Sequence, residues 1–333
     1  MRKMKEHIPS IEVLKQKLRE VLDSNLTDFL ESTHSRRAEL IGNRRYFVLS
    51  LVFLLAAVTG LYIVSTYQSP LINYILIACT AIWSIVLLLS GRSWVTNTKL
   101  LAREMNMAMV PILTNIFDRM LMYTNNTGHA DQTQQLLQES KLLTVPDIVI
   151  TSDDMYSVFG GADTTIRELL VHKTETAKDG KTTQSEIFKG VFVVAELDKM
   201  QVAETFISTD GDRKGFAHRT FWSDLMETGS VKETVLEWND FENHLHVATT
   251  DPTAAREVLT PLLMQDIFDW WSEHKLNMRL AFRGNKLYML LPDASIRIEA
   301  STTSTQPTAI EQYAWSLARP IWRTLLLIDE VRK

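Results

Sequence analysis

The chain has 333 residues, of which 45% are hydrophobic and 23% charged, and its formal net charge is -5. This length suits about two domains, and the 12 glycines and 9 prolines are too few for long disordered linkers or collagen-like repeats. From Tyr46 to Gly91, however, the sequence contains no Asp, Glu, Lys, Arg or His. A soluble core segment does not run that long without a charge, so we expect a membrane protein.

Residues 1–45 are predicted to form an amphipathic helical arm. Its apolar residues recur at steps of three and four, which places them on one face of a helix. Three interpretations of this stripe remain open: packing on the protein's own cytosolic part, pairing with a partner or second copy, and lying on the membrane surface. Acidic residues along the arm weaken the last. The stripe comprises Ile11, Leu14, Leu18, Leu22, Leu26 and Phe29, and we take Leu14, Leu18 and Leu22 as candidate partner contacts.

Residues 46–91 are predicted to form a transmembrane hairpin. Its two spans, 46–67 and 71–90, each provide the roughly 20 apolar residues that a bilayer core requires. Pro70 suits the turn between them or the first turn of the second helix. A cleaved signal peptide is disfavoured, because the apolar run starts more than 40 residues into the sequence and is too long for a signal core. The alternative, a buried helical hairpin of a soluble protein, is disfavoured by the length of the uncharged run.

Positive charges flank the predicted hairpin on both sides, and its turn has no charge. The positive-inside rule therefore predicts a multi-pass protein of the cytoplasmic membrane with both termini in the cytoplasm. The single cysteine, Cys79, falls within the second span, where it can form no intrachain disulfide. The flanking charges are Arg36, Arg37, Arg44 and Arg45 before the hairpin, and Arg92, Lys99 and Arg103 after it.

Residues 92–143 are predicted to form a membrane-proximal helical region. A helix from Trp94 to about Tyr123 is rich in methionine, which suits either a core filler or an adaptable binding surface. A loop follows, and then a short polar helix around Asp131–Leu143.

Residues 144–333 are predicted to form a cytosolic α+β domain with an antiparallel sheet and flanking helices. Gly284 and Asn285 supply a tight hairpin turn. Helices are expected over Pro252 to about His274, with a kink or restart at Pro261, and over Thr308–Val331 with a possible kink at Pro320. The expected strands, rich in β-branched and aromatic residues, are Glu168–Thr174, Ile187–Leu197, Val202–Ser208, Val231–Trp238, Asn277–Phe282, Lys286–Leu291 and Ser295–Ala300.

The charge balance differs between the two ends of the chain. The arm holds ten Lys and Arg against seven Asp and Glu, whereas residues 92–333 hold 25 against 33. An acidic cytosolic region argues against a nucleic-acid partner.

The motifs of common catalytic sites are missing. The sequence contains no Walker phosphate loop, no dinucleotide-binding glycine motif and no nucleophile elbow. Glu242, His244 and His246 would share one face of an extended strand and could form a three-ligand metal set, but an ordinary exposed strand face is the simpler interpretation. Asp210 and Asp212 lack the remaining positions of a calcium loop. We therefore predict no catalytic residue, no metal and no cofactor.

One run of motifs resembles a known family. Leu236-Glu-Trp-Asn-Asp-Phe-Glu242 precedes Asp251-Pro, Ala255-Arg-Glu-Val-Leu-Thr-Pro261 and a hairpin from Leu280 to Tyr288. This order resembles the domain of unknown function 3137 family of uncharacterised bacterial membrane proteins, over about Thr144 to Pro320. The third hairpin strand departs from the family pattern. The resemblance implies a bacterial inner-membrane protein with a cytosolic α+β module, but no activity.

We expect a non-enzymatic, membrane-anchored protein-interaction or assembly module that faces the cytoplasm. Its partners would be the lipid bilayer and either another membrane protein or a second copy of the chain. One alternative is a sensor that binds a small molecule or lipid in a pocket where Glu242, Arg256 and Arg283 converge. Arg256 is also placed to pair with Asp251 or Glu242. Another is a membrane-tethered hydrolase, which requires titratable groups with perturbed pKa values in one cleft.

Overall fold

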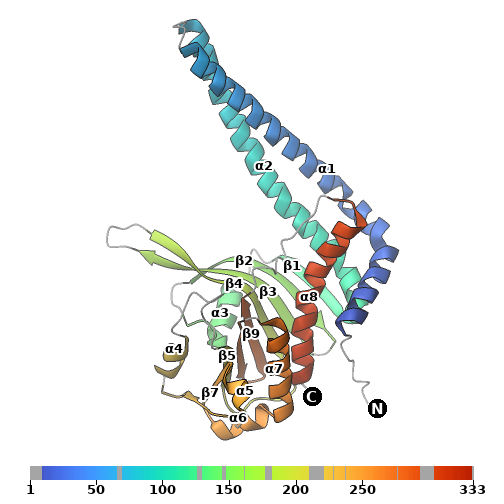
Figure 1. The fold of residues 1–333 in the computed structure, drawn as a ribbon, viewed down its shortest axis with the longest axis vertical. Coiled ribbons are helices and arrows are strands. Elements are labelled where there is room, and N and C mark those ends of the chain that lie inside the picture. Colours follow the sequence, from blue (N-terminus) through green and yellow to red (C-terminus); the bar gives the residue numbers. More distant parts are fainter. Residues whose placement is uncertain are drawn as a thin grey trace. The chain divides into compact units, whose positions relative to one another are not determined.

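A computed structural model of the chain describes residues 10–65, 70–125, 130–144, 148–160, 162–176, 182–209, 221–227, 229–236, 238–275, 277–292 and 304–331. The described residues form a mixed α+β structure with an antiparallel sheet and two long helices (Figure 1). The chain divides into two compact units. We call Met1–Val21, Val110–Ile298 and Ala314–Lys333 the sheet unit, and Leu22–Met109 with Glu299–Tyr313 the hairpin unit.

The hairpin unit consists mainly of parts of two long helices, α1 (Ile11–Ser65) and α2 (Pro70–Phe117). Both helices are long and apolar enough to cross a membrane, and almost none of their most apolar residues are buried. The helices contact each other through two pairs of aromatic rings, of which Phe53 and Trp83 are stacked and Phe47 and Trp94 are tilted. The ring centroids of Phe53 and Trp83 lie 4.7 Å apart, and those of Phe47 and Trp94 lie 5.2 Å apart.

The sheet unit contains one nine-stranded sheet among the described residues, in the order β1-β2-β3-β4-β9-β8-β5-β7-β6. Every pair of neighbours in it is antiparallel. The strands are β1 (Met120–Asn125), β2 (Ile148–Phe159), β3 (Thr164–Thr176), β4 (Thr182–Glu196), β5 (Thr205–Thr209), β6 (Lys232–Glu233), β7 (Leu245–Thr249), β8 (Arg279–Arg283) and β9 (Lys286–Pro292).

Both faces of the sheet are covered. In β4, five consecutive residues from Val191 to Ala195 are buried, although successive side chains point to opposite faces. One core cluster joins Phe188 and Phe192 of β4 to Leu137 of α3 (Ala130–Ser140) and Phe221 of α4 (Phe221–Glu227). The sheet is therefore a packed layer, and its central strands are not available as a binding face.

Helices α7 (Pro261–His274) and α8 (Pro307–Val331) contact each other in the sheet unit (Figure 1). Trp270 Nε1 donates a hydrogen bond to the Arg323 carbonyl at 3.3 Å. A buried ion pair fixes the end of α8, where Arg119 Nη2 lies 2.8 and 3.0 Å from the two carboxylate oxygens of Asp329.

Several predicted elements are confirmed. The predicted hairpin is β8 and β9, and the turn residue Gly284 has a φ of 57°, which glycine adopts without strain. The predicted restart at Pro261 is the boundary between α6 (Pro252–Val258) and α7. Asp251 caps α6 by accepting hydrogen bonds from Thr253 N and Ala254 N, and Thr260 caps α7. Helix α8 continues through Pro320.

Other predicted boundaries were wrong. The methionine-rich helix ends at Phe117 and not near Tyr123, because Asp118 takes a left-handed φ of 50° and the chain enters β1. The sequence patterns did not predict strands β1 and β2. Within the predicted strand Val231–Trp238, only Lys232 and Glu233 form β6. The predicted strand Ser295–Ala300 and the carboxylates Asp210 and Asp212 lie outside the described residues.

Candidate functional site

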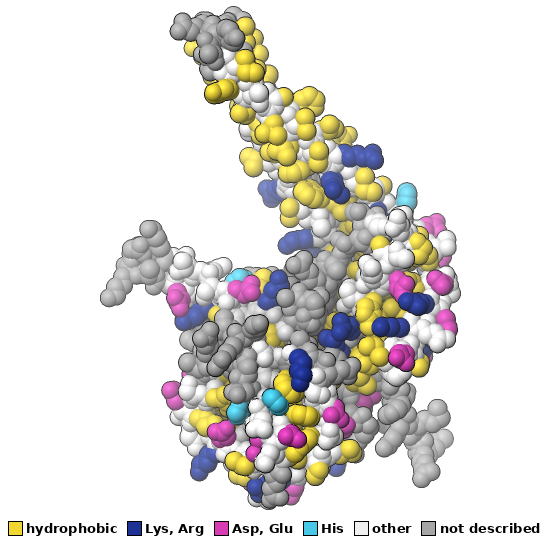
Figure 2. Space-filling model, viewed as in Figure 1, with side chains coloured by type: hydrophobic (Ala, Val, Ile, Leu, Met, Phe, Trp, Pro, Cys, Tyr) yellow, Lys and Arg dark blue, Asp and Glu magenta, His cyan; other side chains and the backbone are white. Residues whose placement is uncertain are grey.

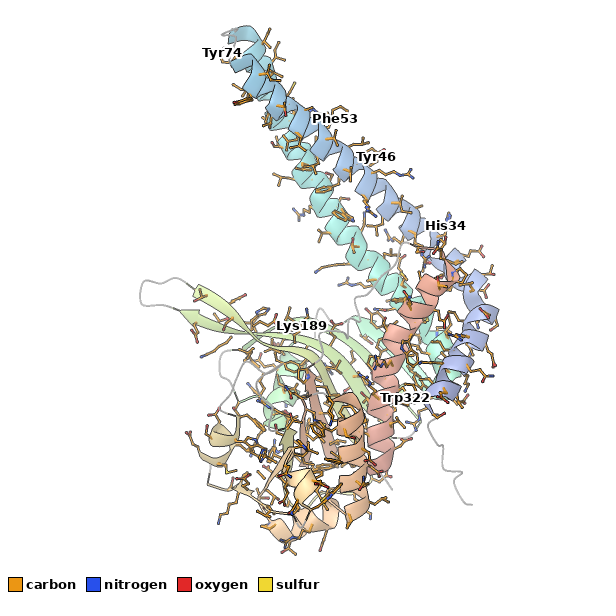
Figure 3. The ribbon with its side chains drawn as sticks, viewed as in Figure 1. His34, Tyr46, Phe53, Tyr74, Lys189 and Trp322 are labelled. Atoms are coloured by element: carbon orange, nitrogen blue, oxygen red, sulfur yellow. The ribbon has the colours of Figure 1, made fainter. Side chains whose placement is uncertain are left out.

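The hairpin unit presents an uncharged apolar surface along both helices. Figure 2 shows hydrophobic side chains over the length of the hairpin, with Lys and Arg near its base. Several hydroxyl groups within the apolar stretch are satisfied locally, because they donate to a carbonyl of their own helix. These donors are Ser50, Thr59, Thr80, Ser84 and Ser90. Tyr46, Tyr62 and Tyr74 are exposed, and Figure 3 labels Tyr46, Phe53 and Tyr74 along the hairpin.

Some of the flanking charges are neutralised within the hairpin unit. Arg36 donates to Glu104 at 2.6 Å and to Glu39 at 2.9 Å, and these bonds raise the pKa of Arg36 above its ordinary value. Asn97 also donates to Glu39, at 3.3 Å. The charge of Arg36 is thus compensated by its own neighbours.

Arg37 is buried and serves the packing of the hairpin unit. Its Nη1 donates to the Ser304 carbonyl at 2.8 Å, and burial lowers the pKa of the guanidinium. Its guanidinium carbon lies 5.5 Å from the ring centroid of Phe29, which stacks on Tyr313. Tyr313 in turn donates to Asn106 at 2.6 Å. Arg44, Arg45, Arg92 and Lys99 remain exposed, with no ion pair among the described residues.

The three candidate leucines of the arm are buried. Leu14, Leu18 and Leu22 are 0%, 1% and 3% exposed. In the sheet unit, Lys17 pairs with Asp118 at 2.7 Å and Lys15 lies 5.2 Å from the ring centroid of Trp315. This burial agrees with the first interpretation of the stripe, packing on the protein's own cytosolic part, although the cytosolic location of that part stays a prediction. As placed, these leucines are not open to a partner.

Arg256 lies at a pocket of about 490 Å³ in the sheet unit. Its guanidinium makes no hydrogen bond or ion pair with any described residue, so the predicted pairing with Asp251 or Glu242 is not formed. The other residues that line the pocket are Leu236, Trp238, Leu259, Pro261, Met264 and Gln265.

Glu242 and Arg283 do not line this pocket, so the predicted convergence of three residues is not formed. Arg283 donates to Glu204 at 2.7 Å, and Lys141 donates to the other carboxylate oxygen at 2.9 Å. Partial burial favours a higher pKa for Glu204, but these hydrogen bonds outweigh it and the pKa lies below its ordinary value. Arg283 is therefore engaged in an ion pair with Glu204 within the fold. Glu242 lies in α5 (Asn239–Glu242), with its buried Oε1 unbonded to any described residue.

The secondary structure also contradicts the possible metal site at Glu242, His244 and His246, which required all three to share one strand face. Glu242 belongs to a helix, His244 to the turn after it and His246 to β7, so the three do not share a strand face. His244 stacks on Trp271 with centroids 4.5 Å apart, and His246 Nδ1 lies 3.4 Å from Glu233. Among the described residues, no group of three or more His, Cys, Asp or Glu is placed to hold a metal ion.

The motif run contains Leu236 and Trp238 as well as Arg256, but the sequence did not predict that these residues line one pocket. Trp238 comes from the irregular segment before α5, far from α6 and α7 in sequence, so no periodicity links it to Arg256. Leu259 and Pro261 were visible in the motif that carries the family resemblance. Met264 lies three residues after Pro261, so the two share one face of a helix. This spacing was the signal in the sequence that could have placed Met264 beside Pro261.

Three comparisons with known proteins give few relatives. The crystal structure of the mycobacterial trehalose monomycolate transport factor A, TtfA, matches at 8% identity and a TM-score of 0.30, over 64% of this chain and 93% of that chain. No curated protein sequence matches. The family described as protein of unknown function (DUF3137) matches residues 186–320, which span β4 to α8 and include Arg256 and its pocket. This match over residues 186–320 confirms the resemblance to the DUF3137 family that the motifs indicate.

Proposed function

We propose that this chain is a non-enzymatic assembly module of a bacterial inner membrane, anchored by the α1–α2 hairpin, with its sheet unit in the cytoplasm. The observation that carries the proposal is the exposed apolar surface of the hairpin unit. Each Å² of such surface costs about 25 cal/mol in water. A core helix of a soluble protein would instead be mostly buried, so a bilayer is the environment that suits this surface.

The dimensions of the hairpin support membrane insertion. Tyr46 and Tyr62 stand near the two ends of the apolar stretch of α1 and are both exposed. Their separation along the helix is about 24 Å at about 1.5 Å per residue, close to the roughly 30 Å of a bilayer core. Exposed tyrosines are typical of the boundary between membrane and water.

The charges at the base of the hairpin support the orientation. Arg44, Arg45, Arg92 and Lys99 are exposed and uncompensated among the described residues, even though Arg36 and Arg37 are engaged within the unit. The segment between the two spans carries no charge. By the positive-inside rule, these charges support the proposal that both termini lie in the cytoplasm.

An exposed apolar patch on the sheet unit supports the assembly role. Met200, Val202 and Leu262 are 80%, 90% and 63% exposed, and all three line a groove of about 370 Å³. Exposed apolar side chains that share one groove provide a surface on which another protein could dock. Nothing among the described residues favours the hydrolase alternative, which required clustered titratable groups.

Two variants test the anchoring and its orientation. In a Cys79→Ala background, we expect Gln68→Cys to react with a membrane-impermeant maleimide from outside spheroplasts. Lys199→Cys should react only after lysis. Extraction of the protein by alkaline carbonate, or the reverse labelling pattern, would refute the anchored topology.

The assembly role is tested separately by the mass and composition of the full chain extracted in mild detergent. We expect a stoichiometric second protein or a defined homo-oligomer. The double variant Met200→Ser, Leu262→Ser should abolish it. The matched control Val235→Ser, which removes an equally exposed apolar side chain elsewhere, should not. A monomer without a companion would refute the assembly role while leaving the topology untouched.

A further inference from the structure

We propose that the pocket beside Arg256 binds a small amphiphile that has one anionic headgroup and an apolar body. The pocket has a volume of about 490 Å³, within the roughly 300–1,000 Å³ of small-molecule sites. Five of its seven lining residues are apolar, and its one cation has no partner among the described residues. The site lies wholly in the sheet unit, so it does not depend on the membrane topology proposed above.

The cation of the pocket is Arg256, and no contact with the described residues gives it a structural role. Other residues of the Asp251–Pro261 run are engaged locally: Asp251 and Thr260 cap helices, and Ala255 and Leu259 are buried. Arg256 is exposed and has no hydrogen bond or ion pair among the described residues. A guanidinium provides paired donors in a plane, which match the oxygens of a carboxylate or phosphate.

The walls of the pocket suit an apolar body. Leu236, Leu259 and Met264 are buried and supply its aliphatic surface. Trp238 supplies an aromatic wall, held by Phe241 and Phe268 with ring centroids 5.7 and 5.2 Å away. A wall fixed by its own neighbours loses little freedom when a ligand binds.

The remaining polar group in the lining does not compete for the anion. Gln265 donates through Nε2 to Asp269 Oδ1 at 2.8 Å, which engages one of its two amide hydrogens away from the ligand, and the group carries no charge. Among the described lining residues, Arg256 is therefore the charged group that selects the headgroup. The same charge disfavours a cationic ligand.

Photolabelling of the full chain in phospholipid nanodiscs tests this site, because no detergent is present to occupy the pocket. The probes are a diazirine-bearing decanoate and the matching diazirine-bearing decanol, followed by peptide mapping. We expect decanoate to label peptides within residues 236–265, and decanol to label them at least about tenfold less, the factor expected for a lost charge-assisted hydrogen bond.

Two variants distinguish recognition of the carboxylate by Arg256 from non-specific binding of the probe. Arg256→Gln should reduce labelling by decanoate to the level of decanol. Arg319→Gln, which removes another exposed guanidinium with no described partner, should leave labelling unchanged. Circular dichroism checks that both variants stay folded. Equal labelling by the two probes, or no decanoate label within residues 236–265, would overturn the proposal.

Discussion

The packing of the arm on its own chain predicts that its leucines stabilise the fold. Leu18 is 1% exposed, whereas Val13 on the same helix is 53% exposed. Leu18→Ala removes three buried carbons, worth about 2.4 kcal/mol at about 0.8 kcal/mol each. The cavity left behind brings the expected cost to between about 2 and 5 kcal/mol. Val13→Ala removes carbons that already contact solvent, so it should cost less than about 0.5 kcal/mol.

Hydrogen–deuterium exchange of the full chain measures this effect locally. If the arm exchanges by opening from the sheet unit, Leu18→Ala should speed exchange of amides in residues 11–21 by at least about thirtyfold. Val13→Ala serves as the control and should leave the exchange rates close to those of the parent chain. Similar protection in both variants would show that the stripe is not packed on its own chain, and the partner interpretation would return.

Three further predictions concern buried charges and titration. Asp329→Asn leaves Arg119 without its ionic partner and should cost about 3 kcal/mol, visible as a lower midpoint of thermal unfolding; an unchanged midpoint would contradict the buried pair. Burial, followed by the nearby Glu139 charge, raises the pKa of Tyr288 to about 12. The folded state therefore keeps the Tyr288 proton to a higher pH than the unfolded state does. The resulting contribution to folding stability is fully present below the pKa of Tyr288 in the unfolded chain and is lost as pH rises towards 12. Tyr288→Phe should remove that part of the alkaline loss in a pH series of unfolding. The lowered pKa of Glu204 has the opposite sign: its stabilisation is present above the ordinary carboxyl pKa and lost as pH falls. Glu204→Gln should flatten the acid limb of stability against pH, and an unaltered acid limb would argue against this ion pair.

Local patterns predicted much of the α+β region because its elements depend on neighbours in sequence. The turn at Gly284 and the restart at Pro261 follow from backbone chemistry at single residues. The edge strand β1 was missed because its residues also suit a helix, and only pairing with β2 makes them a strand. The boundary itself lies at Asp118, whose left-handed conformation no pattern announces.

The candidate functional regions also include features that the sequence predicted and features that only the tertiary structure determined. The uncharged run from Tyr46 to Gly91 alone predicted two helices of membrane-spanning length, because segment length and hydropathy are properties of the chain. The sequence could not predict the contacts of four candidate side chains, because each contact depends on residues that are brought close only by folding. These side chains are Leu14, Arg37, Arg256 and Arg283. In the folded chain, Leu14 is buried, Arg37 donates a hydrogen bond to the Ser304 carbonyl, and Arg283 donates one to the Glu204 carboxylate. It left Arg256 unpaired among the described residues beside an apolar pocket, because Trp238 and α7 reach that place only in the tertiary structure.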